Sequence, residues 1–190
     1  MEPIGGPSLT HPAVFLDRDG VLNKRRFPVL RKPKDLVMLS DAADAAARLS
    51  QAGFVLCIVT NQEFVGRGYL AYADHMELMR LVTTAIENAG GKVAGAYAAL
   101  DPSNAKPRPD MILQAAREHD IDLARSYMVG DNAKDMLAGT RAGCTNVLVD
   151  PRFRTWLQSA HKHAAHVARD LPAAAEWILT RPQAISDHNK

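Results

Sequence analysis

The stretch AVFLDRDGVLN, residues 13–23, decides the fold, because an apolar run ends here in two acids and a glycine. Ala13–Leu16 is continuously apolar, which is typical of a buried strand that reaches a loop at Gly20. Asp17 and Asp19 follow it with one residue between them. Like charges this close are costly when partly desolvated, unless a cation or a proton lies between them. A D-x-D-G turn on the surface is the alternative interpretation.

The composition is that of an ordinary globular domain. The chain has 190 residues, 47% hydrophobic and 23% charged, with a formal net charge of +2. This length accommodates one sizeable core, and so small a net charge does not indicate a nucleic-acid partner. Apolar stretches stay well below the ~20 residues of a membrane span, and the N-terminus lacks the order of a secretory signal. We therefore expect neither a nucleic-acid nor a membrane partner; the oligomeric state stays open, with a monomer favoured.

Two cysteines, Cys57 and Cys144, lie in or beside apolar runs. Free cysteine behaves as a small hydrophobic residue and persists in reducing compartments. The sequence therefore predicts two buried free thiols and a cytoplasmic location.

Strand-like apolar runs alternate with segments of helical spacing along the chain. We predict strands at 13–16, 54–59, 93–99, 126–129 and 145–149, and helices at 41–52, 72–89, 110–119, 133–142 and 172–180. Ser40 or Asp41 is expected to cap the first helix, and residues 22–39 to form an irregular excursion. Such alternation predicts an α/β fold, with a mostly parallel sheet and helices on both faces.

The predicted domain spans residues 13–181. Residues 1–12 contain three prolines and two glycines, which indicates a flexible lead-in. Residues 182–190 are interpreted as a C-terminal tail.

Polar side chains collect where the predicted strands end, which is where ligands bind in open α/β sheets. They are Asp17 and Asp19 after the first strand, Thr60 and Asn61 after the second, Lys106 after the third, and Asp131 and Asp135 after the fourth. Carboxylates that converge from separate strands suit Mg²⁺, which favours phosphate oxygens. A carboxylate can attack phosphorus, a second can move a proton, and hydroxyl, amide and ammonium groups can bind phosphoryl oxygens.

Each of these signals also has a structural interpretation. Thr60 and Asn61 suit a helix cap or a loop, Asp131 and Asp135 are acids that helix starts favour, and Lys106 suits a surface. The order and placement of the whole set favour a phosphoryl-transfer site.

Four motifs in order resemble those of the haloacid dehalogenase superfamily of Mg²⁺-dependent phosphohydrolases. They are FLDRDGVLN (15–23), VTNQ (59–62), AKPRPDM (105–111) and MVGDNAKDMLAGTRAGC (128–144). TNQEFVGRGYL (60–70) is similar to the branch that holds the heptose 1,7-bisphosphate and histidinol-phosphate phosphatases. The resemblance covers about residues 13–149, with a further match at ARDLPAAAEWIL (168–179). It implies a Rossmann-like sheet without a large cap domain.

The resemblance also implies roles for individual residues. Asp17 would be the nucleophile and a metal ligand, and Asp19 the acid and base that also offers its backbone carbonyl to the metal. Thr60 and Asn61 would hold the phosphoryl group, Lys106 would neutralise it, and Asp131 and Asp135 would complete the metal site. The residues expected to face the substrate are Asn23, Arg67, Arg108 and Asn132.

The chain departs from this branch in three places. The stretch YAALDPSNAKPRPD (97–110) has no Cys and no His where heptose bisphosphate phosphatases usually carry a zinc loop, so we expect no zinc. Ala105 stands where an arginine is common before the lysine, and Asn132 where a lysine often follows the aspartate. Arg25, Arg26 and Arg108 offer replacement charge.

The expected activity is hydrolysis of a phosphomonoester on a small metabolite, with heptose 1,7-bisphosphate as the first candidate substrate and its C7 phosphate as the group removed. Histidinol phosphate, a nucleic-acid 3′-phosphate and a non-catalytic binding role are the alternatives. Retention of both Asp17 and Asp19 argues against the non-catalytic role.

Two further stretches are interpreted as solvated structure without a functional role. AHKHAAH (160–166) holds His161, His163 and His166 without a neighbouring acid in sequence, so a solvated helix is preferred over a metal site. RKPK (31–34) is interpreted as a solvated loop.

Overall fold

The computed structural model describes residues 10–150 and 158–181. Most of the predicted lead-in and the predicted tail therefore lie outside the described residues. The elements are β1 (Ala13–Leu16), η1 (Pro33–Asp35), α1 (Ala42–Gln51), β2 (Val55–Asn61), α2 (Glu63–Gly66), α3 (Tyr72–Asn88), β3 (Val93–Ala99), α4 (Asp110–Glu118), η2 (Leu123–Arg125), β4 (Tyr127–Gly130), α5 (Ala133–Ala142), β5 (Thr145–Val149), α6 (Gln158–His161), β6 (His166–Ala168) and α7 (Leu171–Leu179).

The strands of the described chain form one six-stranded sheet in the order β3-β2-β1-β4-β5-β6, and every pair is parallel. The chain winds outward from β1 to β3, returns to the other side of β1 at β4, and winds outward again. Val14 at the centre of β1 pairs with Leu56 of β2 on one side and with Tyr127 of β4 on the other. The order of the sheet thus reverses between β1 and β4, the place where open α/β sheets bind ligands.

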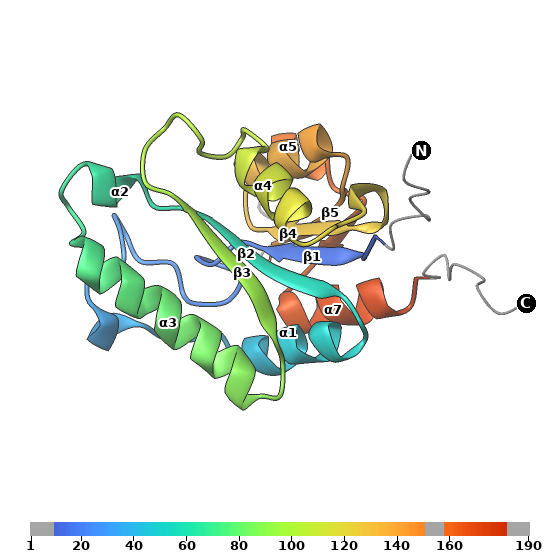
Figure 1. Ribbon diagram of the computed structural model, residues 1–190, viewed down its shortest axis with the longest axis horizontal. Coiled ribbons are helices and arrows are strands. Elements are labelled where there is room, and N and C mark those ends of the chain that lie inside the picture. The colour runs from blue at the N-terminus through green and yellow to red at the C-terminus, as the bar shows by residue number, and fades with distance from the viewer. Residues whose placement is uncertain (1–9, 151–157, 182–190) are drawn as a thin grey trace, which may run out of the picture.

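Helices cover both faces of the sheet, as the sequence predicts. Figure 1 shows α1, α3 and α7 on one side and α4 and α5 on the other. Alternate residues of a strand point to opposite faces, so Val14 and Leu16 enter the core under α1, α3 and α7. Ala13 and Phe15 enter the core under α4 and α5. The Rossmann-like fold class is confirmed.

The helix that opens the site has strong local signals. Asn132 caps α5, and the Asp135 side chain accepts the Asn132 backbone N–H in return, which completes a capping box. Gly143 ends the helix with φ 89°. The predicted cap of α1 is wrong in its chemistry, because Asp41 lies in the left-handed region and its side chain accepts from Ser40 instead of capping the helix.

The histidine-rich stretch is not a continuous helix. His161 ends the short helix α6, and its Nε2 lies 3.1 Å from Asp150 Oδ2. His166 belongs to strand β6, which extends the sheet, and its ring stacks on Trp177 at 4.6 Å. The helical interpretation of this stretch is therefore wrong, because pairing with β5 outweighs the helical preference of its alanines.

The sheet end that holds the site is covered only by short segments. The stretch between β2 and α3, residues 62–71, contains the one-turn helix α2, and residues 17–41 contain η1. No large cap domain is inserted in these described stretches, as the sequence predicts. Within residues 10–150 and 158–181, helices long and apolar enough to cross a membrane are absent.

Candidate active site

The carboxyl ends of four neighbouring strands deliver the candidate side chains to one place. Asp17 follows β1, Thr60 lies near the end of β2, and Asp131 follows β4. Asp135 lies in the first turn of α5, and Lys106 reaches in from the loop after β3. All five are buried, although each carries a polar or charged group.

Three carboxylates and one ammonium form the centre of the site. Asp17, Asp131 and Asp135 each offer an oxygen within 4.8 Å of the others. Lys106 Nζ lies 2.9 Å from Asp17 Oδ1 and 2.6 Å from Asp135 Oδ1, and it also donates to the Val59 carbonyl at 2.8 Å. Three acids thus face one fully buried cation. Hard oxygen donors with excess negative charge fit a divalent cation such as Mg²⁺.

Close backbone packing holds the acids in this arrangement. The second oxygen of Asp135 accepts the backbone N–H groups of Asp131 at 3.2 Å and of Asn132 at 3.1 Å. A Cβ at Gly130 would lie 2.2 Å from Asp135 Cβ, so only glycine lets β4 approach α5 this closely. With both oxygens engaged, Asp135 fixes Lys106 and the start of α5.

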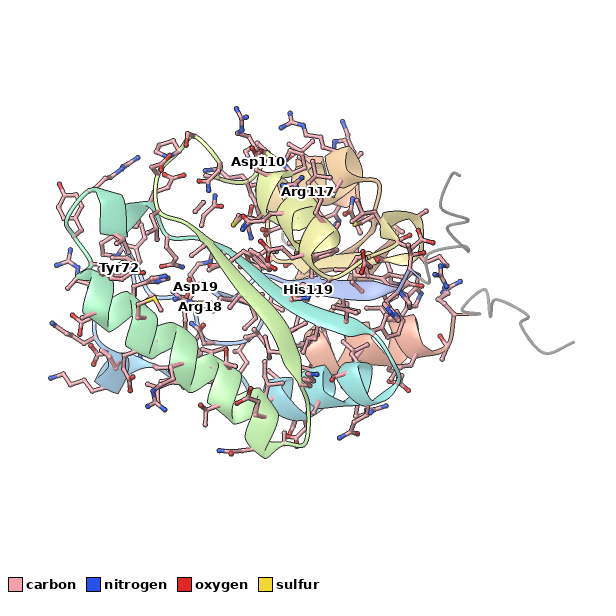
Figure 2. The ribbon with its side chains drawn as sticks, in the orientation of Figure 1. Arg18, Asp19, Tyr72, Asp110, Arg117 and His119 are labelled. Atoms are coloured by element: carbon pink, nitrogen blue, oxygen red, sulfur yellow. The ribbon has the colours of Figure 1, made fainter. Side chains whose placement is uncertain are left out.

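Asp19 is separated from this centre by its own set of donors. Its carboxylate accepts from Arg18 Nη2 at 2.7 Å, Asn23 Nδ2 at 2.9 Å and Gln62 Nε2 at 3.0 Å. Burial raises the pKa of Asp19, but the charge of Arg18 and the three donors outweigh it, so the pKa lies below its ordinary value. Figure 2 shows Arg18 and Asp19 beside the first half of α3, where Arg18 contacts Met79.

The pKa of Asp17 moves the other way. Burial raises the pKa of Asp17 most, the ammonium of Lys106 lowers it, and the charges of Asp135 and Asp19 raise it, so that the resulting pKa is about 6. Burial disfavours the charged form of Lys106, but Asp135 and Asp17 outweigh it and raise the Lys106 pKa, so this ammonium stays charged.

Thr60 and Asn61 have different partners. Thr60 Oγ1 faces the pocket and accepts from Gln62 Nε2 at 2.9 Å. The Asn61 side chain donates to the Lys106 carbonyl and accepts the Lys106 backbone N–H, both at 2.9 Å. Asn61 therefore fixes the loop that carries the lysine.

The four expected substrate residues lie in different surroundings. Asn23 is fully buried beneath Asp19, and Asn132 lines the pocket while it caps α5. Arg67 pairs with Glu63 at 3.4 Å and Arg108 with Asp110 at 3.2 Å, and both arginines lie outside the pocket lining.

Sequence reasoning gave no role to Arg18 and Gln62 and expected Arg25 only to offer replacement charge. Arg18 is fully buried and also donates from Nη1 to Met79 Sδ at 3.7 Å, and Gln62 bridges Thr60 and Asp19. Arg25 Nη2 lies 2.5 Å from Asp131 Oδ1 and 3.1 Å from the Asp19 carbonyl oxygen. The sequence signals these residues only by their places in or near the motifs, because most of their contacts join segments that come together only in the folded chain.

The acids open into a pocket of about 510 Å³. Its walls come from the loop after β1, from α2, from the start of α5 and from α6; they include Arg26, Val29, Leu30, Glu63, Phe64, Asn132, Lys134 and Ser159. Arg25 also borders a second cavity of about 590 Å³, which Asp131 lines. The volume of the first pocket suits a small organic ligand.

Comparison with known proteins places the chain in a family. Residues 103–174 match the model of the HAD-hydrolase-like family. A D-glycero-D-manno-heptose-1,7-bisphosphate 7-phosphatase of Thermosynechococcus vestitus is 36% identical over 90% of this chain and 97% of its own. The Bordetella bronchiseptica protein named D-glycero-beta-D-manno-heptose-1,7-bisphosphate 7-phosphatase is 32% identical over 87% of this chain and 97% of its own.

Solved structures agree with these relatives. The crystal structure of D,D-heptose 1,7-bisphosphate phosphatase from B. bronchiseptica, complexed with magnesium and phosphate, has a TM-score of 0.76 at 30% identity and covers 88% of this chain and 98% of its own. That of Burkholderia thailandensis has a TM-score of 0.67 at 27% identity and covers 90% of this chain and 99% of its own. The chain is therefore a phosphatase of the haloacid dehalogenase-like superfamily and belongs to the family that holds the heptose bisphosphate 7-phosphatases.

Proposed function

We propose that this enzyme removes the C7 phosphate of D-glycero-D-manno-heptose 1,7-bisphosphate, with Mg²⁺ and through an aspartyl-phosphate on Asp17. The cluster of Asp17, Asp131 and Asp135 around Lys106 is the observation that carries the proposal. The relatives named heptose bisphosphate phosphatases, 31–36% identical over most of the chain, support the substrate.

Asp17, Asp131 and the Asp19 carbonyl would hold the metal ion, which would neutralise phosphoryl oxygens when bound. Asp135 would support them by fixing Asp131 and Lys106.

In the first step, a carboxylate oxygen of Asp17 bonds to phosphorus while the bond from phosphorus to the C7 oxygen breaks. Asp19 in its protonated form gives its proton to the leaving oxygen. The negative charge of the arriving phosphate favours that protonated form. Lys106 and Thr60 stabilise the charge on the phosphoryl oxygens.

In the second step, Asp19 takes a proton from water, and the water oxygen attacks the phosphorus of the aspartyl-phosphate. The bond from phosphorus to Asp17 breaks, and inorganic phosphate leaves. Arg18, Asn23 and Gln62 favour the ionised form of Asp19, which is the form that this step requires.

Phosphorus NMR of the reaction tests the substrate. Heptose 1,7-bisphosphate is expected to lose its C7 ester signal, to keep its C1 signal and to release one equivalent of phosphate. Histidinol phosphate and a 3′-phosphorylated oligonucleotide are the comparison substrates. A higher kcat/KM for either of them would reject the substrate assignment.

We also propose that the enzyme works without zinc, as a monomer in the cytoplasm. Residues 97–110 lack Cys and His, and Asn61 holds the Lys106 loop by two backbone contacts instead. Both cysteines are free and buried, which suits a reducing compartment. Elemental analysis is expected to find no stoichiometric zinc, and one zinc per chain would reject this part. Light scattering tests the monomer, and cell fractionation tests the location.

A further inference from the structure

The cations of the active-site pocket fall into two groups. Two of them form ion pairs with carboxylates. Lys106 pairs with Asp17 and Asp135, and Arg25 pairs with Asp131. Arg26 and Lys134 line the same pocket with exposed side chains. Among the residues that the structure describes, neither the Arg26 guanidinium nor the Lys134 ammonium has a carboxylate partner.

The remaining acids of the pocket cannot neutralise these two cations. Asp19 is paired with the buried Arg18 at 2.7 Å. Glu63 is paired at 3.4 Å with Arg67, which lies outside the pocket lining. The acids of the pocket floor are thus each paired with Lys106, Arg25 or Arg18, whereas the two cations of the rim have no carboxylate partner among the described residues.

The two cations come from different walls. Arg26 belongs to the loop after β1, together with Val29 and Leu30, which also line the pocket. Lys134 lies in the first turn of α5, next to the floor residue Asp135. A ligand that reaches from the floor to the rim meets a positive charge on each wall.

Neither the residue before the lysine nor the residue after Asp131 gives the rim a charge. Ala105, beside the catalytic lysine, is 4% exposed and packs in the core under α4 and α5. Asn132 caps α5 and donates to Asp131 Oδ1 at 3.1 Å. Arg26 and Lys134 are thus the rim groups with free capacity for an anion.

We propose that Arg26 and Lys134 form a second anion-binding end of the active-site pocket, which holds the phosphate that the enzyme does not remove. This proposal rests on the proposed function and deepens it, because it names the residues of this chain that would hold the C1 phosphate of the bisphosphate. Charge-assisted hydrogen bonds to phosphate are stronger than neutral ones, so the second phosphate contributes affinity. Histidinol phosphate carries an ammonium group at the corresponding end, which two unpaired cations repel.

The test compares substrates with and without the second phosphate. The kcat/KM of Arg26→Met, Lys134→Met and the double variant is measured on heptose 1,7-bisphosphate and on heptose 7-phosphate. Arg80→Met, an exposed arginine on α3 that pairs with Glu77, is the matched control. Each single variant is expected to lower the preference for the bisphosphate about 10-fold, mainly through KM, since a charged hydrogen bond contributes at least that factor.

The control is expected to keep the wild-type preference. An unchanged preference in both single variants and in the double variant would overturn the proposal, as would an equal loss on both substrates. Fructose 1,6-bisphosphate and fructose 6-phosphate form a second pair of substrates. If the wild type releases no phosphate from the heptose substrate, the proposed function fails, and this second pair still tests the rim.

Discussion

Asp17 and Asp19 are two residues apart in the chain, but their surroundings differ. Asp17 shares a buried centre with two other acids, and burial raises its pKa to about 6. Burial raises the pKa of Asp19, but the charge of the neighbouring Arg18 and the hydrogen bonds that Asp19 accepts outweigh burial, so the pKa of Asp19 is lowered. When the environments of two carboxylates shift their pKa values in opposite directions, the two groups can take different roles in catalysis. The contrast supports a nucleophile at Asp17 and a proton carrier at Asp19.

The raised pKa of Asp17 predicts a pH-dependent cost in metal-free protein. An acid whose pKa is raised in the folded state destabilises the fold when it is ionised. This cost is absent below the unfolded pKa and complete above the folded pKa, so stability falls as the pH rises from about 4 to about 6. In EDTA, Asp17→Asn is expected to raise Tm above about pH 6 and to leave it unchanged near about pH 4. If the variant melts below wild type at the higher pH, burial of the Asp17 charge does not destabilise the fold.

Arg25 predicts the strength of metal binding. Its guanidinium contacts Asp131 Oδ1 and the Asp19 carbonyl oxygen, two atoms that we expect to bind Mg²⁺. The ion must displace this arginine, so Arg25→Met is expected to bind Mg²⁺ several-fold more tightly by calorimetry. Arg80→Met serves as the control for loss of a surface charge. Weaker binding by Arg25→Met would mean that the arginine supports the metal site.

At the scale of elements, the approach of β4 to α5 positions the acids. Gly130→Ala places a methyl group against Asp135 and is expected to lower kcat at least about 10-fold, since misplaced catalytic groups are costly. Gly143→Ala is the matched variant, because Gly143 has open space and φ 89° at the other end of α5. It is expected to cost about 1 kcal/mol of stability and to keep kcat. Equal losses of kcat in both variants would show that the effect is unfolding.

Elements with complete local signals were predictable from the sequence. The residue bounds of β1, β3, α5 and β5 match the prediction, and α5 carries both a capping residue and a terminal glycine. The short elements α2 (EFVG), α6 (QSAH) and β6 (HVA) were not predicted, because they lack the continuous apolar run that marks the four-residue β1. β6 forms only because the edge of β5 offers it backbone partners.

The site divides in the same way. Asp17, Asp131 and Lys106 follow predicted strands, and their meeting is a consequence of parallel topology. Gln62 follows β2 and reaches Asp19 in the loop after β1, and Arg18 contacts Met79 of α3 while it pairs with its neighbour Asp19; such packing leaves no pattern in the sequence.

At the scale of the molecule, the core under α4 and α5 buries both thiols. Cys57 lies in the middle of β2 and Cys144 before β5, and burial raises the pKa of each to about 12. At about pH 8 the folded protein is expected to resist iodoacetamide, since the thiolate is the reactive form, whereas denatured protein takes up two labels by mass spectrometry. Rapid labelling of the folded protein would contradict the burial of these cysteines.

The reversal of strand order between β1 and β4 creates the crevice in which the whole site lies, so the central claim concerns Asp17 at its centre. The most direct measurement is the rate of phosphate release from heptose 1,7-bisphosphate by wild type and Asp17→Asn, with Mg²⁺ and with EDTA. We expect one equivalent of phosphate from wild type with Mg²⁺ and a loss of at least about 10³-fold in kcat for Asp17→Asn. Turnover by Asp17→Asn at a rate comparable with wild type would contradict the role of Asp17 as the nucleophile.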